Sequence, residues 1–306
     1  MTIGLRAPRA EELATVADQL DLTGTVAMAY PPPDPERDLR VAEADGRVVG
    51  SAVVQVVGGT TVFSSDGSEA FCRGQVAAEH RGRGVGAALL RWTLQRAQRE
   101  PGVREAWTTL RHADAVPLLE AAGFRHDRTG RLMTHATPAA VPEPDWPAGV
   151  GADTSLRGER LVDAVMVACD RAFADQPRYR GATRANVARL FAHPHADPTL
   201  CFLAVRDGEL VGLNFCLLER PGGAGGALEG WVHDLGVAPE VRGLGLGRAL
   251  LLHGVRAMAR RGAGKVLLGL DAANARARRL YEGTGFVTAE ELRYYRLVFP
   301  AELRGR

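Results

Sequence analysis

Two stretches of this chain carry nearly the same glycine-rich sequence. The first is Arg81-Gly-Arg-Gly-Val-Gly-Ala-Ala-Leu-Leu90, and the second, 161 positions later, is Arg242-Gly-Leu-Gly-Leu-Gly-Arg-Ala-Leu-Leu251. A Gly-Phe pair recurs 162 positions apart, at Phe124 and Phe286. Two separate matches at almost one spacing indicate a duplication. Repeats this long are domains rather than solenoid units, so the chain is expected to fold as two related domains.

The domain boundary is predicted from prolines. Pro138, Pro142, Pro144 and Pro147 make residues 137–148 an extended linker. Residues 1–136 and 149–306 are then the N-terminal and C-terminal domains. Strand and helix patterns alternate in both, which favours an α/β fold with a mixed (α+β) sheet, twice.

Hairpins are predicted in both halves. One crosses Asp45-Gly46 and the other Asp207-Gly208, since these dipeptides suit tight turns. The last strand pattern, residues 286–298, is expected to close the second sheet.

Composition excludes several classes of function. The 306 residues include 46% hydrophobic residues, which is ample for two cores, and 38 basic against 36 acidic residues leave a net charge of +2. This balance gives no signature of nucleic-acid binding. The sequence contains no run of 18 apolar residues, so no membrane span is expected. The first residues lack a secretion signal, so a cytoplasmic location is expected. Two domains fused in one chain can replace a dimer of single domains, so a monomer or weak homodimer is expected.

The four cysteines predict neither a metal site nor a disulfide framework. Cys72, Cys169, Cys201 and Cys216 show no Cys-x-x-Cys spacing. They are expected to be small buried or half-buried residues.

The second glycine-rich stretch predicts a cradle for a pyrophosphate. An apolar strand, residues 231–237, leads into it, and a helical pattern, residues 247–261, follows. Glycines permit a sharp turn and a close approach of the backbone, and the helix start presents N–H groups to an anion. No Gly-Lys-Ser/Thr follows, so this is not a Walker loop, and the glycine spacing is not that of a dinucleotide fingerprint.

Two motifs in the second half resemble those of the GCN5-related N-acetyltransferase (GNAT) superfamily. Arg242-Gly-Leu-Gly245-Leu-Gly247 resembles its motif A, and Asn274-Ala-Arg-Ala-Arg-Arg-Leu-Tyr281-Glu-Gly-Thr-Gly285-Phe286 resembles its motif B. The resemblance implies acetyl-CoA as co-substrate and transfer of its acetyl group to an amine. It also implies that two neighbouring strands splay apart to admit the pantetheine arm.

The resemblance assigns site residues. Cofactor contacts are expected from the loop and helix start and from two amides of the preceding strand: Arg242, Gly243, Leu244, Gly245, Gly247, Arg248, Leu235 and Val237. Tyr281 stands at the position of the general acid, and a phenol with a pKa of about 10 is protonated at neutral pH. Asn274 either binds the cofactor or caps the helix that it begins, and both readings stay open.

The general base is less directly indicated. Some relatives carry a glutamate where this chain has Trp231, which cannot serve. Alternation along a strand places Glu229, Trp231, His233 and Leu235 on one face, so His233 is the leading candidate. A packed strand histidine is the competing reading. Asp234 would point the other way unless a bulge re-aims it.

The first copy keeps the cradle but departs elsewhere. Arg81, Gly82, Gly84 and Gly86 remain as predicted cofactor contacts. Leu119, His112 and Cys72 stand where the second copy has Tyr281, Asn274 and His233. The N-terminal domain is therefore expected to be degenerate, either binding cofactor or supporting its neighbour, while the C-terminal domain catalyses.

A tandem pair with one degenerate member resembles the family of acetyltransferases that includes mycothiol synthase. The primary hypothesis is an acetyl-CoA-dependent N-acetyltransferase acting on the primary amine of a small molecule. The alternatives are a protein or peptide N-acetyltransferase and a non-catalytic acyl-CoA-binding sensor. Retention of Tyr281 argues against the sensor.

Overall fold

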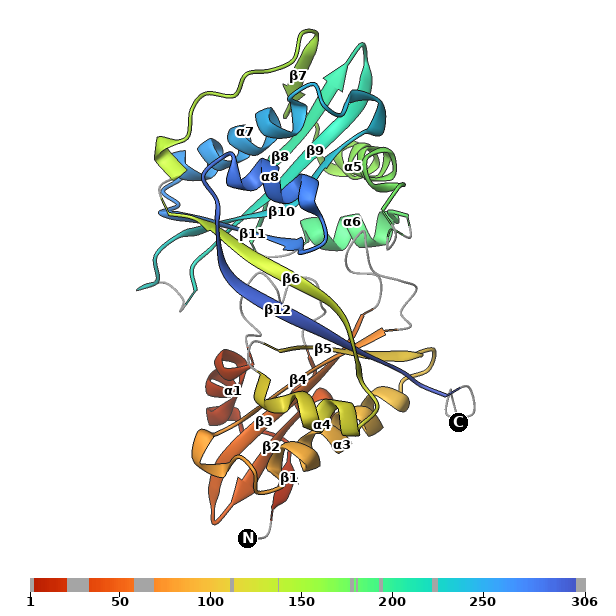
Figure 1. The fold of residues 1–306 in the computed structure, drawn as a ribbon, viewed down its shortest axis with the longest axis vertical. Helices are drawn as coiled ribbons and strands as arrows, with labels where there is room; N and C mark the ends of the chain where they lie inside the picture. The colour runs from red at the N-terminus through yellow and green to blue at the C-terminus, as the bar shows by residue number, and fades with distance from the viewer. Residues whose placement is uncertain are drawn as a thin grey trace. The chain divides into compact units, whose positions relative to one another are not determined.

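The computed structural model describes residues 3–20, 33–57, 69–110, 113–136, 138–176, 179, 181–192, 195–221 and 225–300. The chain forms two compact units. Among the described residues, unit 1 contains the chain up to Arg128 together with everything from Leu292 onward, and unit 2 contains Thr129–Glu291. Each unit contains both parallel and antiparallel strand pairs and helices of its own (Figure 1).

Unit 2 is built on six strands in the order β7-β8-β9-β10-β11-β6. Their bounds are β6 (Arg125–His135, in this unit from Thr129), β7 (Val150–Asp153), β8 (Ala196–Arg206), β9 (Glu209–Glu219), β10 (Glu229–Val237) and β11 (Lys265–Asp271). Only β10 and β11 are paired in parallel, and the other neighbours are antiparallel. The sheet is therefore mixed, as the sequence predicts.

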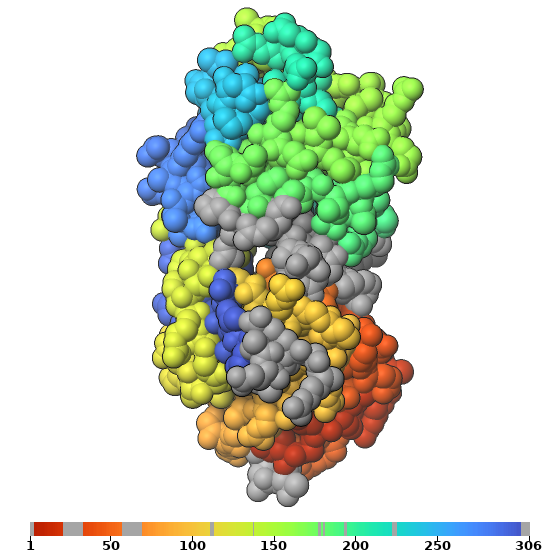
Figure 2. Space-filling model, turned by 90° about the vertical axis from the view of Figure 1, so that its right-hand side faces the viewer, coloured from red at the N-terminus to blue at the C-terminus, as the bar shows by residue number. Residues whose placement is uncertain are grey.

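Helices cover both faces of this sheet (Figure 1). They are α5 (Gly158–Phe173), α6 (Arg184–Phe191), α7 (Leu246–Arg260) and α8 (Ala275–Glu282). Glycines set how closely the helices lie. A Cβ on Gly236 would lie 2.6 Å from the Phe173 ring of α5, and one on Gly254 of α7 would lie 2.4 Å from Asn214 of β9. In Figure 2 the green surface in the upper part includes residues of α5 and α6.

Unit 1 repeats this plan in the order β1-β2-β3-β4-β5-β12. Its strands are β1 (Gly4–Arg6), β2 (Leu39–Ala44), β3 (Arg47–Val57), β4 (Glu69–Val76), β5 (Glu105–Leu110) and β12 (Val287–Val298, in this unit from Leu292). Its helices are α1 (Leu13–Gln19), α2 (Pro35–Asp38), α3 (Val85–Gln98) and α4 (Val116–Ala121). Again one pair, β4 with β5, is parallel. The duplication read from the sequence is thus a duplication of the fold.

The hairpin predictions are confirmed. Asp45 and Asp207 adopt positive φ values of 50° and 52°, each followed by a glycine that is also in the left-handed region. Two successive residues with positive φ form the turn whose twist matches that of the flanking strands.

The closing strands differ from expectation. Residues 293–298 of β12 pair with β5 of unit 1, and residues 130–135 of β6 pair with β11 of unit 2. The expectation that residues 286–298 close the second sheet is therefore wrong. Both segments follow a Gly-Phe pair and have similar strand patterns, so local sequence does not choose between two equivalent sheet edges. The extended linker expected at residues 137–148, between the two sequence repeats, stays a prediction.

All four cysteines are free and buried, as predicted. Burial raises the pKa of the Cys72 and Cys201 thiols to about 12, the charge of Asp234 adding to the effect at Cys201. Such thiols are unreactive at neutral pH. No helix in the described ranges is long and apolar enough to cross a membrane.

The Gly-Phe pair of the second repeat depends on a backbone shape that only glycine adopts easily. Gly285 has a φ of 94°, and a Cβ there would lie 2.8 Å from Nε2 of His135 on β6. Gly262 has the same φ of 94°, but a Cβ there would meet only Leu228, at 4.0 Å. The two glycines form a matched pair.

We expect Gly285→Ala to destabilise the protein more than Gly262→Ala. Both substitutions place alanine in the left-handed region at a cost of roughly 1–2 kcal/mol. Only Gly285→Ala adds an overlap with a buried ring, which costs about 1–3 kcal/mol more. Urea unfolding of the two variants measures the difference. Equal destabilisation would show that His135 does not constrain this turn.

Candidate functional site

The loop between β10 and α7 has the geometry of an anion cradle. Gly243 and Gly245 have φ values of 86° and 89°, in the region that favours glycine. Gly245 is the N-cap of α7, no side chain caps it, and the first helical hydrogen bond runs from Ala249 N to Gly245 O at 3.0 Å. The N–H groups of residues 245–248 therefore have no helical partner and add to the positive end of the helix dipole.

Arg242 holds this loop in place through its side chain. Its Nε donates to the Val237 carbonyl oxygen at 2.9 Å, and its Nη2 donates to the Ala172 carbonyl oxygen at 2.9 Å and to Asp175 Oδ1 at 2.8 Å. Nη1 completes the ion pair with Asp175, and hydrogen bonding to the guanidinium lowers the pKa of Asp175 to about 2. The arginine of the motif is thus committed to the protein itself.

Strands β10 and β11 part in the middle of β10. Their parallel pairing runs from Glu229↔Lys265 to Val232↔Leu268 and stops there, although β11 continues to Asp271. Residues 233–237 consequently have β9 on one edge and an unpaired edge on the other. This is the splay that the resemblance implies.

The backbone of Leu235 and Val237 faces the unpaired edge. Ala238 N donates to Val211 O on the β9 side at 2.9 Å. Because donors alternate along an antiparallel ladder, the N–H groups of Val237 and Leu235 point the opposite way. The bond from Arg242 to the Val237 carbonyl on that side agrees with this direction. Both predicted amides are therefore placed at the splay.

A β-bulge occurs in β10 at His233. The register with β9 passes from Val232↔Cys216 directly to Asp234↔Phe215, so His233 is an extra residue. Its ring lies 5.8 Å from the Phe215 ring, on the face toward α6, where Phe191 also contacts Phe215. Leu235 and Val237 pack instead against the core formed with α7. The predicted face shared by His233 and Leu235 is therefore wrong, and the alternative of a bulge that re-aims Asp234 is found.

The bulge brings two titratable side chains together. His233 Nδ1 lies 2.9 Å from Asp234 Oδ2, and their side chains are 14% and 8% exposed. Burial lowers the pKa of His233, but the charge of Asp234 and its hydrogen bond outweigh burial, so the pKa lies above the ordinary 6.5. Asp234 thus makes the imidazole a stronger base than burial alone would allow.

Tyr281 is within the field of the same carboxylate. It is buried on α8, and desolvation together with the charge of Asp234 raises its pKa to about 12. The phenol is therefore protonated at any neutral pH. None of the residues that the structure describes forms a hydrogen bond with its hydroxyl group, which leaves the group available as a donor. Asp234 thus acts electrostatically on both Tyr281 and His233, three residues that were predicted separately.

Asn274 caps α8. Its side chain accepts a hydrogen bond from Ala277 N at 3.0 Å. At the other end of α8, Arg248 Nη1 donates to Gly283 O at 2.9 Å, and Thr284 Oγ1 donates to the carbonyl oxygens of Leu280 and Tyr281. These bonds fix the helix that carries Tyr281. A cofactor contact of Asn274 stays a prediction.

The first repeat keeps the cradle and the splay without the bulge. Gly82 and Gly84 have φ values of 72° and 85°, and Arg81 Nε donates to Val76 O at 3.2 Å, as Arg242 does to Val237. Gly86 follows in the first turn of α3. Pairing of β4 with β5 stops at Phe71↔Trp107, whereas the register of β4 with β3 is unbroken.

The chemical groups of the second repeat have no counterpart in the described part of the first. Cys72 and Leu119 are buried in the core where His233 and Tyr281 stand in the second copy. His112 lies outside the described residues. The first repeat thus has the geometry for a cofactor without the groups for the reaction.

Sequence reasoning missed two supporting residues. Asp175 anchors Arg242, and Glu219 of β9, which is buried, accepts a hydrogen bond from Trp231 Nε1 at 2.6 Å. Asp175 and Arg242 are 67 positions apart, so no local pattern connects them. For Glu219, an acidic residue ending a strongly apolar strand was the available signal.

Comparison with known proteins agrees with this geometry. The pattern of the acetyltransferase (GNAT) family matches residues 167–286, and that of a GNAT acetyltransferase domain matches residues 35–126. The chain belongs to this family, in its tandem form, and acetyl-CoA is the acetyl donor that the family uses. The family resemblance and the fold class are thereby confirmed.

Similar proteins include mycothiol acetyltransferases. That of Frankia casuarinae is 38% identical over 224 residues, which are 69% of this chain and 63% of the relative, so less than two thirds of that protein is covered. That of Streptomyces coelicolor is 32% identical over 253 residues, 82% of this chain and 76% of the relative.

Two solved structures share the fold. A GCN5-related N-acetyltransferase from Sphaerobacter thermophilus aligns with a TM-score of 0.74 at 24% identity, covering 97% of this chain and 95% of that one. A tandem GNAT protein from the clavulanic acid biosynthesis pathway aligns with a TM-score of 0.68 at 20% identity, covering 98% and 100%.

The residues present fit acetyl-CoA. The uncapped amides of residues 245–248 suit its pyrophosphate, and the unpaired edge of β10 suits an extended pantetheine arm, which carries amides of its own. Fixed N–H donors at Leu235 and Val237 would stabilise negative charge on a thioester oxygen in the transition state.

We expect the imidazole of His233 to titrate above 6.5 and to fall below that value in Asp234→Asn. Removing the carboxylate charge leaves burial as the main influence, and burial lowers the pKa of a histidine. NMR titration of the ring nitrogens measures both values. His253, whose pKa burial already lowers, serves as the internal control and is expected not to change. An unchanged midpoint for His233 would contradict the pairing.

Proposed function

We propose that the chain transfers the acetyl group of acetyl-CoA to the primary amine of a small molecule, and that unit 2 carries out the reaction. The observation that carries this proposal is the bulge in β10, which joins the His233–Asp234 pair to the splayed edge. The curated relatives, named mycothiol acetyltransferases, support a small-molecule acceptor. A cytoplasmic setting is part of the proposal.

Each group at the site has a separate role in the proposed reaction. The cradle amides bind the pyrophosphate, and the amides of Leu235 and Val237 bind the acetyl carbonyl oxygen. His233, held by Asp234, takes a proton from the acceptor ammonium, whose free pKa is about 10.4, so that the amine can attack the carbonyl carbon.

Tyr281 acts on the sulfur of the departing thiolate. A phenol whose pKa is about 12 is a weaker acid than a thiol, whose free pKa is about 8.5. A complete transfer of its proton is therefore unfavourable, and Tyr281 serves mainly by donating a hydrogen bond to the developing negative charge. The acceptor ammonium gives up two protons in all. The first goes to His233 before the attack and leaves through it, and the second, on the nitrogen of the tetrahedral intermediate, goes to the departing thiolate, which leaves as the thiol.

Trp231 separates this site from relatives that carry a glutamate there. Its indole is hydrogen-bonded to Glu219, so neither partner has the position of a free carboxylate base on β10. The role of general base therefore falls to His233, the bulged residue two positions further along β10.

We expect Tyr281→Phe to lower kcat with acetyl-CoA about a hundredfold or more, with little effect on its binding, because a donor to the leaving sulfur is lost. Release of free thiol from acetyl-CoA, measured with a panel of small amines and amine-bearing peptides, gives both the rate and the acceptor class. Full turnover by Tyr281→Phe would remove Tyr281 from the reaction. Binding of acetyl-CoA with no turnover on any amine would favour a sensor, and selective turnover of peptides would favour a peptide acetyltransferase.

We expect Gly245→Val to raise the KM for acetyl-CoA and Gly84→Val to leave this KM unchanged. Both residues are helix N-caps with nearly the same φ, 89° and 85°, so valine strains each backbone alike. Losing the N-terminal anion site of α7 costs about 2 kcal/mol, or roughly a thirtyfold rise in KM. Steady-state kinetics of the two variants measure it. A larger loss in Gly84→Val would place catalysis in unit 1.

A further inference from the structure

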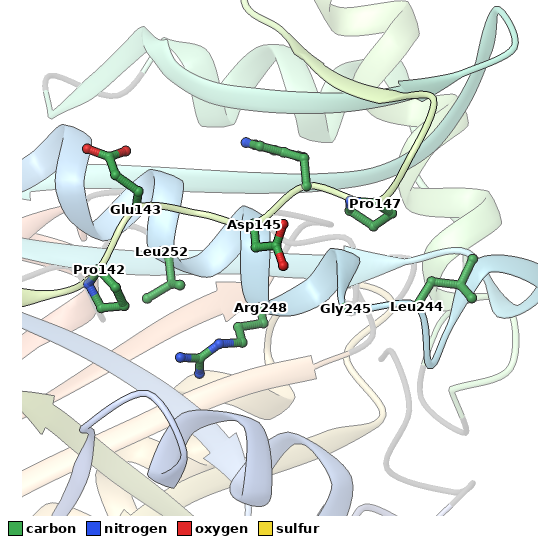
Figure 3. Close-up of a pocket in the computed structure, with 9 residues that line it drawn as sticks. Pro142, Glu143, Asp145, Pro147, Leu244, Gly245, Arg248 and Leu252 are labelled. Carbon is green, nitrogen blue, oxygen red and sulfur yellow. The ribbon is translucent and has the colours of Figure 1, made fainter.

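A pocket adjoins the cradle on the outer side of α7. Its volume is about 310 Å³, and it lies between α7 and the proline-rich segment that precedes β7 (Figure 3). The lining residues are Pro142, Glu143, Asp145, Trp146 and Pro147 from that segment and Leu244, Gly245, Arg248 and Leu252 from the cradle and α7. Such a volume is at the lower limit for ligand sites, so it suits part of a ligand.

The pocket is continuous with the predicted pyrophosphate site. Leu244 and Gly245 belong to both, and Gly245 offers one of the unpaired amides. In acetyl-CoA the adenosine 3′-phosphate is attached directly to the pyrophosphate. A donor bound at the cradle therefore has its adenosine within reach of this pocket.

The charges around the pocket are unequal. Arg248 is exposed, uses one guanidinium nitrogen for Gly283 O, and has no acidic partner among the described residues. Glu143 is neutralised by its ion pair with Arg256. Asp145 forms no ion pair with any residue that the structure describes, and Figure 3 shows its carboxylate turned toward α7. One free cation and one free acceptor thus border the same space.

Trp146 gives the pocket an aromatic wall. The indole is half-buried, packs edge-on against His253 with ring centroids 5.6 Å apart, and contacts the main core of unit 2. These contacts order the ring before any ligand arrives, and the ring also lines the pocket. Bases stack on such rings at a gain of about 1–3 kcal/mol.

Resting on the proposed function, we propose that this pocket binds the adenosine 3′-phosphate end of acetyl-CoA. The adenine stacks on Trp146, Asp145 accepts a hydrogen bond from the adenine amino group or the ribose hydroxyl, and Arg248 binds the 3′-phosphate. The proline-rich segment is then a specificity element that distinguishes acetyl-CoA from thioesters on shorter carriers.

Donors of different length test the subsite in the full-length protein. We expect Trp146→Ala to raise KM for acetyl-CoA roughly tenfold at unchanged kcat, while KM for acetyl-4′-phosphopantetheine, which lacks adenosine, is unchanged. Trp146→Phe keeps an aromatic face and is expected to restore KM to within about threefold of wild type. Equal losses with both donors would show that Trp146 only supports the fold.

Calorimetry with adenosine 3′,5′-bisphosphate gives a readout independent of turnover. We expect it to bind, to compete with acetyl-CoA, and to bind about tenfold more weakly to Trp146→Ala and to Arg248→Gln. Binding without competition would mean a separate nucleotide site and would overturn the proposal, as would binding that neither variant affects. If wild type binds no acetyl-CoA at all, the proposed function itself fails; if it transfers acetyl groups equally well from both donors, only the subsite fails.

Discussion

One extra residue in β10 determines how the second repeat can act. A slip of one position moves every later side chain of a strand to the other face. Because His233 is inserted opposite β9, Asp234 joins it on the α6 side, and Leu235 and Val237 turn toward α7. The same strand thus presents amides at the splay and an acid–base pair beside it. Without the bulge Asp234 would lie on the opposite face from His233, and the pKa of the imidazole would follow burial alone.

The first repeat separates the two parts of this design. Its strands β4 and β5 part at the position equivalent to that in β10 and β11, and its loop has the same left-handed glycines. Its register with β3 is unbroken, and Cys72 is buried where the histidine would be. The geometry for a cofactor therefore comes from the splay and the loop, whereas the proposed chemistry also needs the bulge and Tyr281. On that proposal, fold and function are separable within one chain.

The sequence predicted those features whose physical cause lies within a few neighbouring residues. The glycines of the cradle and the Asp-Gly hairpins follow from backbone sterics within a few residues, and they were predicted. The bulge arises because one strand has an extra residue relative to its neighbour. The ion pair of Arg242 joins residues 67 positions apart. Strands β6 and β12 each pair with one of two similar sheet edges. These depend on contacts that exist only in the folded chain. Tyr281 was found through its motif, but its interaction with Asp234 required the bulge.

The electrostatics of the cradle also differ from what its arginine suggests. The guanidinium of Arg242 is bound to Asp175, so its charge is largely balanced before any phosphate approaches. Attraction for an anion at the loop must then come from neutral N–H groups and the helix dipole, with Arg248 as the cation still open to solvent. Oriented amides contribute where the backbone is rigid, and Arg242 supplies that rigidity by tying the end of β10 to the end of α5. In the proposed function, the arginine therefore acts on the cofactor through the shape of the loop rather than through its charge.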